Sequence, residues 1–269
     1  MSSTAAIPVV PAIEFIGVDK RFPARGNSPE VLAATNVTLA IAPGEIVSLI
    51  GPSGCGKSTL LNMGSGLSKP SAGTVRVDGQ VVDGPNSHVS FMLQKDLLMP
   101  WRTIAENVEY GLELRGVPAA QRREVSSRLL VKCHLAGFGD SYPHQLSGGM
   151  RQRAAMARTL AVDPLVLLMD EPFSALDAQT KMILQQDLAK TVTDEGKTVL
   201  FITHDLAEAV ALSDRILVMS ERPGTIVESI DVDLPDARNP MVRRKREEVG
   251  RYVAHLMDML KLDANSDVH

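Results

Sequence analysis

A glycine-rich loop at residues 51–59 constrains the fold of this chain more than any other stretch. It reads Gly-Pro-Ser-Gly-Cys-Gly-Lys-Ser-Thr and matches the pattern G-x-x-x-x-G-K-[ST] at every defined position. Residues 45–50 before it form a short apolar run that indicates a buried strand, and residues 59–63 indicate the start of a helix. A loop of this pattern between a strand and a helix is typical of a phosphate-binding site.

The residue types in this loop suit an anionic ligand. Its glycines permit positive φ and close approach of the backbone, so that successive N–H groups and a helix N-terminus can converge on phosphate. Lys57 adds a positive charge for the terminal phosphates, and the Ser58 hydroxyl can ligate Mg²⁺. A glycine turn with a chance lysine is the alternative, which the flanking strand and helix disfavour. The predicted nucleotide-binding residues here are Gly51, Pro52, Ser53, Gly54, Cys55, Gly56, Lys57, Ser58 and Thr59.

The pattern of strands and helices predicts an α/β fold with a mostly parallel sheet. Short apolar runs that alternate with helical segments are typical of parallel strands covered on both faces. Those runs are 45–50, 89–93, 165–170, 198–202 and 216–219, and the helices between them are 148–162, 178–193 and 206–212. An antiparallel layer is expected from strands at 12–18 and 37–41, joined by a loop at 21–29, and from a hairpin at 75–82 that turns at Asp78-Gly79.

Residues 103–136 have helical periodicity, interrupted at Gly116-Val117-Pro118. We expect an inserted α-helical subdomain at 95–147, between two parts of the α/β core at 12–94 and 148–235. Residues 236–269 are expected to hold a C-terminal amphipathic helix, from Met241 to Leu260, and a tail. Its basic cluster, Arg243-Arg244-Lys245, is interpreted as a solvated face rather than as a lipid or nucleic-acid site.

Composition excludes several classes of protein. The net charge of −4 over 269 residues gives no support for a nucleic-acid partner. Two cysteines offer no disulfide framework and indicate a reducing compartment. The chain contains no run of about 18 apolar residues, so no membrane span is expected. Met1 to Val10 lacks the basic start of a secretion signal, so a loose tail is expected there.

Two further stretches carry candidate chemistry. Asp170 and Glu171 end an apolar strand, at the sheet edge where ligands bind in open α/β folds. Asp170 is a candidate metal ligand, and Glu171 can polarise an attacking water. Residues 146–152, Leu-Ser-Gly-Gly-Met-Arg-Gln, place a second anion-binding loop at a helix start. Because one nucleotide does not need two such loops from one chain, this loop is expected to contact a γ-phosphate bound to another subunit.

With these motifs the chain resembles the ATP-binding subunit of an ABC transporter over residues 12–235, which implies a P-loop NTPase core. Six motifs match in the order of that family: the Walker A loop at 51–58, the Q-loop at Gln94, the signature at 146–152, the Walker B strand at 165–171, the D-loop at 174–177 and the switch histidine at His204. Phe22 occupies the place of the aromatic residue that stacks on adenine.

The resemblance implies a head-to-tail homodimer that holds two Mg·ATP at its interface. Each site would combine the Walker motifs of one subunit with Ser147, Gly148 and Gly149 of the other, and Asp177 would link the two sites. Glu171 and His204 would hold the attacking water, Gln94 would ligate Mg²⁺ with Ser58 and Asp170, and Lys57 would stabilise charge on the transferred phosphoryl group.

A finer resemblance concerns the transported solute. Residues 97–102, Ser220-Glu221-Arg222-Pro223-Gly224 and 231–235 are similar to the nitrate, sulfonate and taurine branch of bacterial importers. This implies a separate membrane permease that docks near Gln94 to Arg102, a solute-binding protein, and a peripheral location on the cytoplasmic face of the inner membrane. Trp101, the only tryptophan, is expected on that docking surface; packing in the core is the alternative, and both can hold.

Two other functions use the same nucleotide-binding motifs. A soluble ABC-type ATPase of DNA repair or translation would normally carry a long coiled-coil insertion or two fused units, whereas only about 90 residues separate Lys57 from Ser147. A nucleotide-binding regulator without hydrolysis is disfavoured because both Glu171 and His204 are present.

Overall fold

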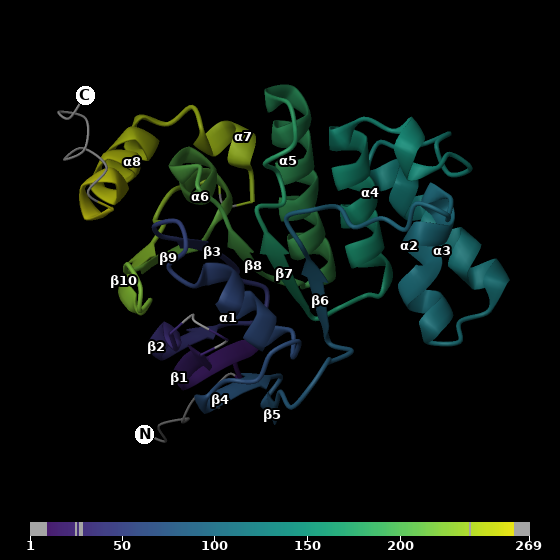
Figure 1. The fold of residues 1–269 in the computed structure, drawn as a ribbon. Helices are drawn as coiled ribbons and strands as arrows, with labels where there is room; N and C mark the ends of the chain where they lie inside the picture. The colour runs from purple at the N-terminus through teal and green to yellow at the C-terminus, as the bar shows by residue number, and fades with distance from the viewer. Residues whose placement is uncertain (1–9, 25, 27–28, 237, 261–269) are drawn as a thin grey trace, which may run out of the picture.

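The computed structural model describes residues 10–24, 26, 29–236 and 238–260. The tail expected at Met1 to Val10 lies almost entirely outside these residues, as does part of the loop expected at 21–29. Two β-sheets and a group of helices make up the described chain (Figure 1). None of the described helices is long and apolar enough to cross a membrane.

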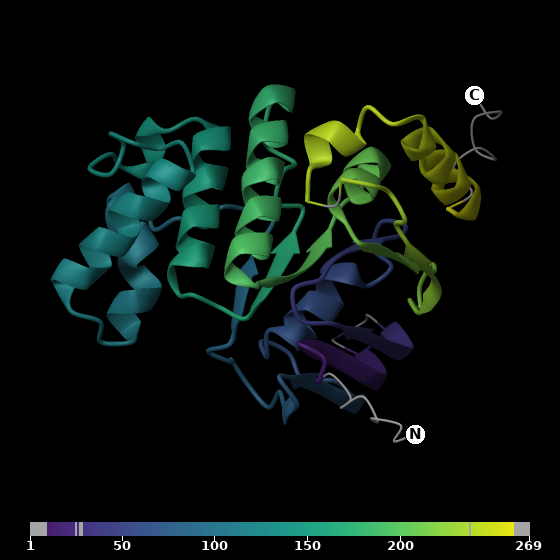
Figure 2. The same cartoon turned by 180° about the vertical axis from the view of Figure 1, so that it is seen from behind.

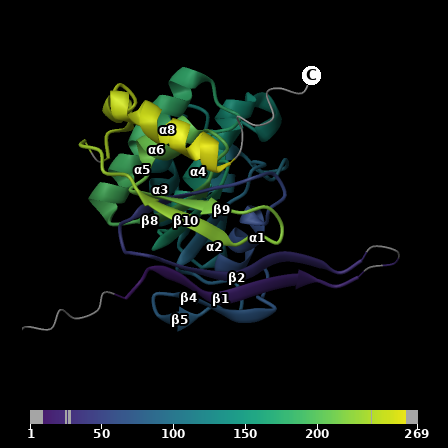
Figure 3. The ribbon, with the colours of Figure 1, turned by 90° about the vertical axis from the view of Figure 1, so that its left-hand side faces the viewer.

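The smaller sheet is antiparallel, with the strand order β2-β1-β4-β5. Its strands are β1 (Ile13–Phe22), β2 (Val31–Ile41), β4 (Ala72–Val77) and β5 (Gln80–Val81). Phe15 pairs with Leu39 on one side and with Val75 on the other. Both long strands extend further than predicted, so that Phe22 ends β1 instead of lying in a loop. Figure 3 shows this sheet as a separate layer beside the larger one.

The larger sheet has the strand order β10-β9-β3-β8-β7-β6. Its strands are β3 (Ile46–Ile50), β6 (Val89–Met92), β7 (Val166–Asp170), β8 (Thr198–Ile202), β9 (Arg215–Met219) and β10 (Ile226–Asp231). All pairs are parallel except β10 with β9. The predicted α/β class is confirmed, although β10 was not predicted, because its exposed polar residues interrupt the apolar pattern.

Alternate side chains of the central strands enter two different cores. Val47, Leu49 and Leu168 face the smaller sheet and α1 (Lys57–Gly64). Ile46, Leu167 and Phe201 belong to the core formed with the long helices on the opposite face. Burial on both faces explains why these strands read as continuous apolar runs rather than as alternating ones.

The predicted helical region forms one end of the molecule, opposite the C-terminal helix (Figures 1 and 2). It contains α2 (Ile104–Leu114), α3 (Ala119–Lys132) and a 3-10 turn (Pro143–Gln145), and α4 (Gly148–Ala161) follows directly after its predicted end. Thr103 and Glu106 form a capping box at the start of α2, and Gly116 at φ 72° separates α2 from α3. Helix α4 packs against α2 and α3 and also contacts β6, so it bridges the helical region and the core.

The C-terminal segment differs from the prediction in two ways. The expected single helix is divided into α7 (Pro240–Arg243) and α8 (Glu247–Met259). Arg243 is buried and donates to the carbonyl oxygens of Ser213 and Leu234, at 2.7 and 3.1 Å. Arg244 donates to Gln185 on α5 (Ala178–Glu195) at 2.9 Å. The interpretation of the basic cluster as a solvated face is therefore wrong, because two of its three residues anchor the segment.

Candidate nucleotide-binding and catalytic site

The loop at 51–56 joins β3 to α1 and is closely packed by its neighbours. A Cβ atom at Gly51 would lie 2.7 Å from the carbonyl oxygen of Met219, and one at Gly56 would lie 2.7 Å from that of Ala33. Both glycines have positive φ, 157° and 113°. Side chains at these two positions would therefore both strain the backbone and push the loop away from β9 and β2.

Lys57 begins α1 and lies against its own loop. Its ammonium group donates to the carbonyl oxygens of Gly51 and Pro52, at 2.7 and 2.8 Å, and lies 3.7 Å from the Cys55 sulfur. The Cys55 thiol itself is buried beneath the loop. The lysine is thus held at the centre of the glycine-rich turn, where a phosphate chain would approach.

A pocket of about 380 Å³ lies beside this loop. Phe22 and Lys57 line the same pocket, so the structure brings these two predicted site residues together. The Phe22 ring is 43% exposed, and the ammonium of Lys20 lies 5.3 Å from its centroid. The residues that line the pocket are Phe22, Val31, Ala33, Gly54, Gly56, Lys57, Ser58, Thr59 and Arg222.

The sheet edge brings together three candidate residues that are far apart in the sequence. Gln94 follows β6, Glu171 follows β7, and His204 follows β8, and these strands are neighbours in the order β8-β7-β6. The Gln94 amide donates to one Glu171 carboxylate oxygen at 2.9 Å, and Nδ1 of His204 lies 3.3 Å from the other. Glu171 is the centre of this cluster, which we call the Gln94–Glu171–His204 cluster.

Glu171 is held in place by its backbone. Its N–H donates to the carbonyl of Ile202 at 3.0 Å, and its φ of 48° is in the left-handed region. This conformation is uncommon for a residue with a side chain and occurs often at functional sites. It turns the chain sharply at the end of β7 and fixes where the carboxylate lies.

Asp170 and Ser58 provide oxygen ligands of the kind that Mg²⁺ prefers. Burial raises the pKa of the Asp170 carboxyl, and the neighbouring Glu171 charge raises it further, while a hydrogen bond from Ser58 and the charge of Lys57 oppose this shift. The Ser58 hydroxyl is hydrogen-bonded to the Asp170 carboxylate, and Gln94 follows the strand next to β7, so the oxygen atoms of these three residues are a donor set that would suit Mg²⁺. No cluster of three or more His, Cys, Asp or Glu side chains suited to a metal occurs among the described residues.

The 146–152 loop is built as a helix start. Ser147 is the N-cap of α4 and accepts from the Met150 N–H at 3.3 Å. A Cβ atom at Gly149 would lie 3.3 Å from Leu176, so this loop lies against residues 174–177. Asp177 caps α5 by accepting from Thr180 at 3.0 Å, and this hydrogen bond lowers its pKa. No described residue of the 146–152 loop lines the pocket beside Lys57.

Helix α4 also holds the segment after Gln94. Arg151 donates to the Asp96 carboxylate at 3.0 Å, and Arg158 donates to the carbonyl oxygens of Asp96 and Leu97 at 2.6 and 2.8 Å. Two arginines of one helix thus connect the loop at 146–152 to the loop that carries Gln94. These contacts were not predicted, because the two loops are more than fifty residues apart.

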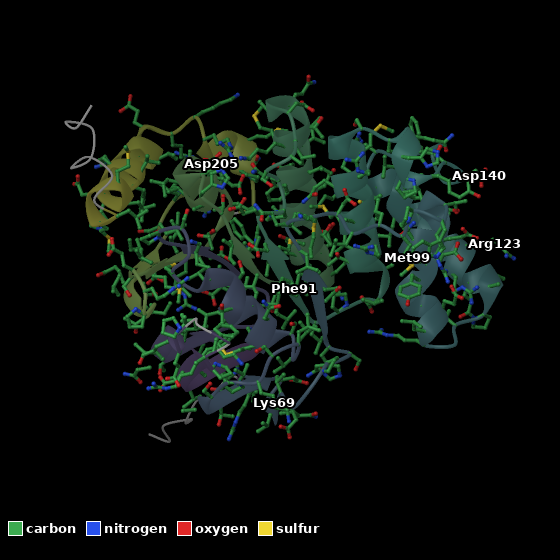
Figure 4. All side chains as sticks on the ribbon, in the orientation of Figure 1. Lys69, Phe91, Met99, Arg123, Asp140 and Asp205 are labelled. Atoms are coloured by element: carbon green, nitrogen blue, oxygen red, sulfur yellow. The ribbon has the colours of Figure 1, made fainter. Side chains whose placement is uncertain are left out.

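A buried polar network braces the segment that carries His204, and it too was missed. Asp205, which is labelled in Figure 4, lies at the start of α6 (Leu206–Leu212). It pairs with Lys181 at 2.7 Å. Lys181 also pairs with the buried Glu208 at 2.6 Å, and burial raises the pKa of that carboxyl. The sequence held one indication of this network. Lys181 lies four residues after Asp177, the N-cap of α5, so it lies on the same helix face one turn further along.

Comparison with known proteins gives the family. The family model described as "ABC transporter" matches residues 34–174, more than half of the chain. An uncharacterised ABC transporter ATP-binding protein of Methanocaldococcus jannaschii is 47% identical over 87% of this chain and 86% of its own length. The taurine import ATP-binding protein TauB of Yersinia pestis is 47% identical, covering 75% and 79%, and the nitrate import ATP-binding protein NrtD of Synechocystis is 43% identical, covering 88% and 91%.

A solved structure agrees with these relatives. An ATP-binding cassette captured as a dimer in a post-hydrolysis state, bound to ADP and Pi, is 33% identical to this chain. The match has a TM-score of 0.75 and covers 82% of this chain and 99% of that one. The family and the importer branch predicted from the motifs are both confirmed. This chain belongs to the ABC transporter family, as one of its ATP-binding proteins, and it is an ATP hydrolase.

Proposed function

We propose that two copies of this chain close head to tail on two Mg·ATP and power import of a small anion-like solute through a separate membrane permease. The solute would be taurine, an aliphatic sulfonate or nitrate. Relatives named for taurine and nitrate import, at 47% and 43% identity, support this class of solute. The location that follows is peripheral, on the cytoplasmic face of the inner membrane.

The observation that carries the hydrolytic part is the Gln94–Glu171–His204 cluster. Glu171 has one carboxylate oxygen 2.9 Å from an amide donor and the other 3.3 Å from an imidazole, so the acid is oriented from two sides. From this position it accepts a proton from water as that water attacks the γ-phosphorus, and the bond from the γ-phosphorus to the bridging oxygen of ADP breaks. His204 contacts the γ-phosphate and keeps the water in line.

The loop at 51–59 provides the electrostatic part. Its N–H groups, the start of α1 and Lys57 stabilise negative charge on the transferred phosphoryl group. Phe22, which lines the same pocket, would offer an aromatic face to adenine. Ser58, Asp170 and Gln94 would hold Mg²⁺, which supplies charge neutralisation on the phosphates when it is bound.

The second half of each site would come from the partner copy. Ser147, Gly148 and Gly149 lie at a helix start but line no described part of the Lys57 pocket. In a head-to-tail dimer these residues of one copy would face the γ-phosphate held by the other, and Asp177 would lie near both sites. The dimeric state of the solved relative supports this arrangement.

The loop at 99–103 is the proposed docking surface for the permease. Trp101 is 74% exposed, so its placement in the core is wrong. The buried Asn107 holds this loop: its oxygen accepts from Met99, and its amide donates to the carbonyl oxygens of Met99, Arg102 and Thr103. Figure 4 labels Met99 in this loop, and Arg123 and Asp140 in the helical region beside the loop. A cavity of about 840 Å³ lies between Trp101, α2 and α3. A rigid loop that exposes an aromatic beside a cavity suits a protein partner.

We expect Trp101→Ala to weaken binding of the permease by about tenfold or more, the loss typical of an exposed aromatic anchor. Binding is measured with the purified permease in detergent, and thermal unfolding is followed to verify that the fold is intact. Leu67→Ala is the matched control, since Leu67 is also exposed, at 61%, but lies after α1. Equal binding by the two variants would argue against docking at this loop.

Co-expression tests the proposed function as a whole. The chain is purified together with a co-expressed candidate permease, and ATP hydrolysis is measured with a solute-binding protein and taurine, aliphatic sulfonates or nitrate. Stimulation by one of these solutes would support the proposal and name the solute. Co-purification with no membrane protein, together with unstimulated hydrolysis, would favour an ABC-type ATPase that is not coupled to transport.

A further inference from the structure

The turn at 220–225, between β9 and β10, packs directly on the phosphate-binding loop. The Gly224 N–H donates to the carbonyl of Ala33 at 3.1 Å, and its carbonyl accepts from the Thr35 N–H at 3.0 Å. A Cβ atom at Gly224 would lie 2.2 Å from the carbonyl oxygen of Cys55. Only glycine fits there, so the turn is fixed against both β2 and the loop at 51–56.

Arg222 reaches from this turn to the phosphate-binding loop. Its Nε and one terminal nitrogen both donate to the carbonyl oxygen of Gly54, at 3.0 and 2.6 Å. Gly54 has a φ of 74°, in the left-handed region that glycine adopts easily. Its carbonyl oxygen therefore lies outside the regular hydrogen bonding of a helix or strand. The guanidinium therefore restrains the loop between Ser53 and Cys55.

The charge of Arg222 is not neutralised by the described part of the protein. None of the ion pairs formed by the described residues includes it. A guanidinium has five N–H donors, and two of those of Arg222 are used on Gly54. The side chain lines the same pocket as Phe22 and Lys57. A second positive charge with spare donors thus borders the place where a polyphosphate would lie.

We infer that Arg222 is a nucleotide-binding residue, which attracts the phosphates of ATP and ADP and holds Gly54 in the shape that binds them. The inference rests on the proposed nucleotide site and adds to it a residue from outside the loop at 51–59. Arginine suits both tasks, because its planar fork can bond a carbonyl with one edge and an anion with the other. Lysine at this position would keep the charge but lose the paired hydrogen bonds.

The test compares Arg222→Gln, Arg222→Lys and the wild type, with Arg76→Gln on β4 as the matched control. Dissociation constants for ATP and ADP are measured by calorimetry at 50 and 300 mM salt, and hydrolysis is followed as a function of ATP concentration. Arg222→Gln is expected to weaken both nucleotides by about five- to tenfold at low salt and by less at high salt, since salt screens a partly exposed charge. We expect KM to rise and kcat to stay within about twofold, and Arg222→Lys to be intermediate.

Unchanged dissociation constants in Arg222→Gln would overturn the inference. Equal weakening in Arg222→Gln and Arg222→Lys that does not depend on salt, with a lower melting temperature, would also overturn it, because a purely structural role produces that pattern. Lys57→Ala separates this failure from failure of the proposed site. If Lys57→Ala binds ATP normally, the nucleotide site itself is misplaced. If Lys57→Ala abolishes binding while Arg222→Gln does not weaken it, only the role of Arg222 is wrong.

Discussion

Glu171→Gln is expected to lower steady-state ATP hydrolysis by at least about 10³-fold, within the range that a positioned general base contributes. Glutamine has nearly the same shape and can still contact Gln94 and His204, but it cannot accept a proton from the attacking water. ATP binding should stay within about twofold of the wild type, because Lys57 and the loop at 51–56 are untouched. The variant should therefore accumulate as a dimer that retains ATP.

Phosphate release and the size of the particle in solution are the two measurements. Glu228→Gln on β10 is the matched control: Glu228 is exposed and pairs only through its backbone. Normal hydrolysis by Glu171→Gln would remove this residue from its catalytic role. Loss of ATP binding together with hydrolysis would instead indicate that the substitution disturbs the left-handed turn at the end of β7.

Lys57→Ala is expected to weaken ATP binding by about 100-fold or more, because the variant loses a partly buried charge that faces the terminal phosphates. The ammonium also bonds the carbonyl oxygens of Gly51 and Pro52, so the loop loses two internal hydrogen bonds as well. Binding is followed with a fluorescent ATP analogue. Lys69→Ala removes an exposed lysine that pairs with Asp83 and should bind the analogue normally (Figure 4). Retained affinity in Lys57→Ala would be incompatible with the proposed site.

The central part of the fold was predictable because burial leaves a direct mark on sequence. Strands covered on both faces must be apolar throughout, and each of them was found within one or two residues. The loop at 51–59 was equally clear, since its pattern has few chemical alternatives. Residues that end parallel strands lie at the sheet edge where ligands bind, which explains why Asp170 and Glu171 could be named without coordinates. His204 could be named only through the resemblance to the family.

What could not be predicted depends on packing between distant segments. Strand β10 carries polar residues because it lies at the sheet edge, so its sequence has no apolar run. The buried Arg243 donates hydrogen bonds to backbone carbonyl oxygens. The pattern of charges in the sequence does not reveal that these carbonyls lie beside it. Arg222 lies in the stretch 220–224, whose sequence indicates only the resemblance to the importer branch. Its bonds to Gly54 depend on the turn at 220–225 lying against the loop, which composition and spacing do not reveal.

The central claim is that each ATP site combines residues from two copies of the chain. Within one chain the loop at 146–152 lines no described part of the Lys57 pocket, and in the proposed head-to-tail dimer the partner copy would supply this loop. Lys57→Ala removes one half of both sites in a homodimer, and Ser147→Arg removes the other half. A mixed dimer of the two variants, however, contains one site with both halves intact.

Mixing these two variants, each also carrying Glu171→Gln and a different tag, is the most direct measurement. After addition of ATP, dimers that carry both tags are isolated by tandem affinity purification, and the retained ATP is counted. The composite site predicts that neither variant dimerises alone, whereas the mixture forms dimers with one ATP each. Absence of mixed dimers, or dimers of either variant alone that retain as much ATP as Glu171→Gln itself, would contradict the claim.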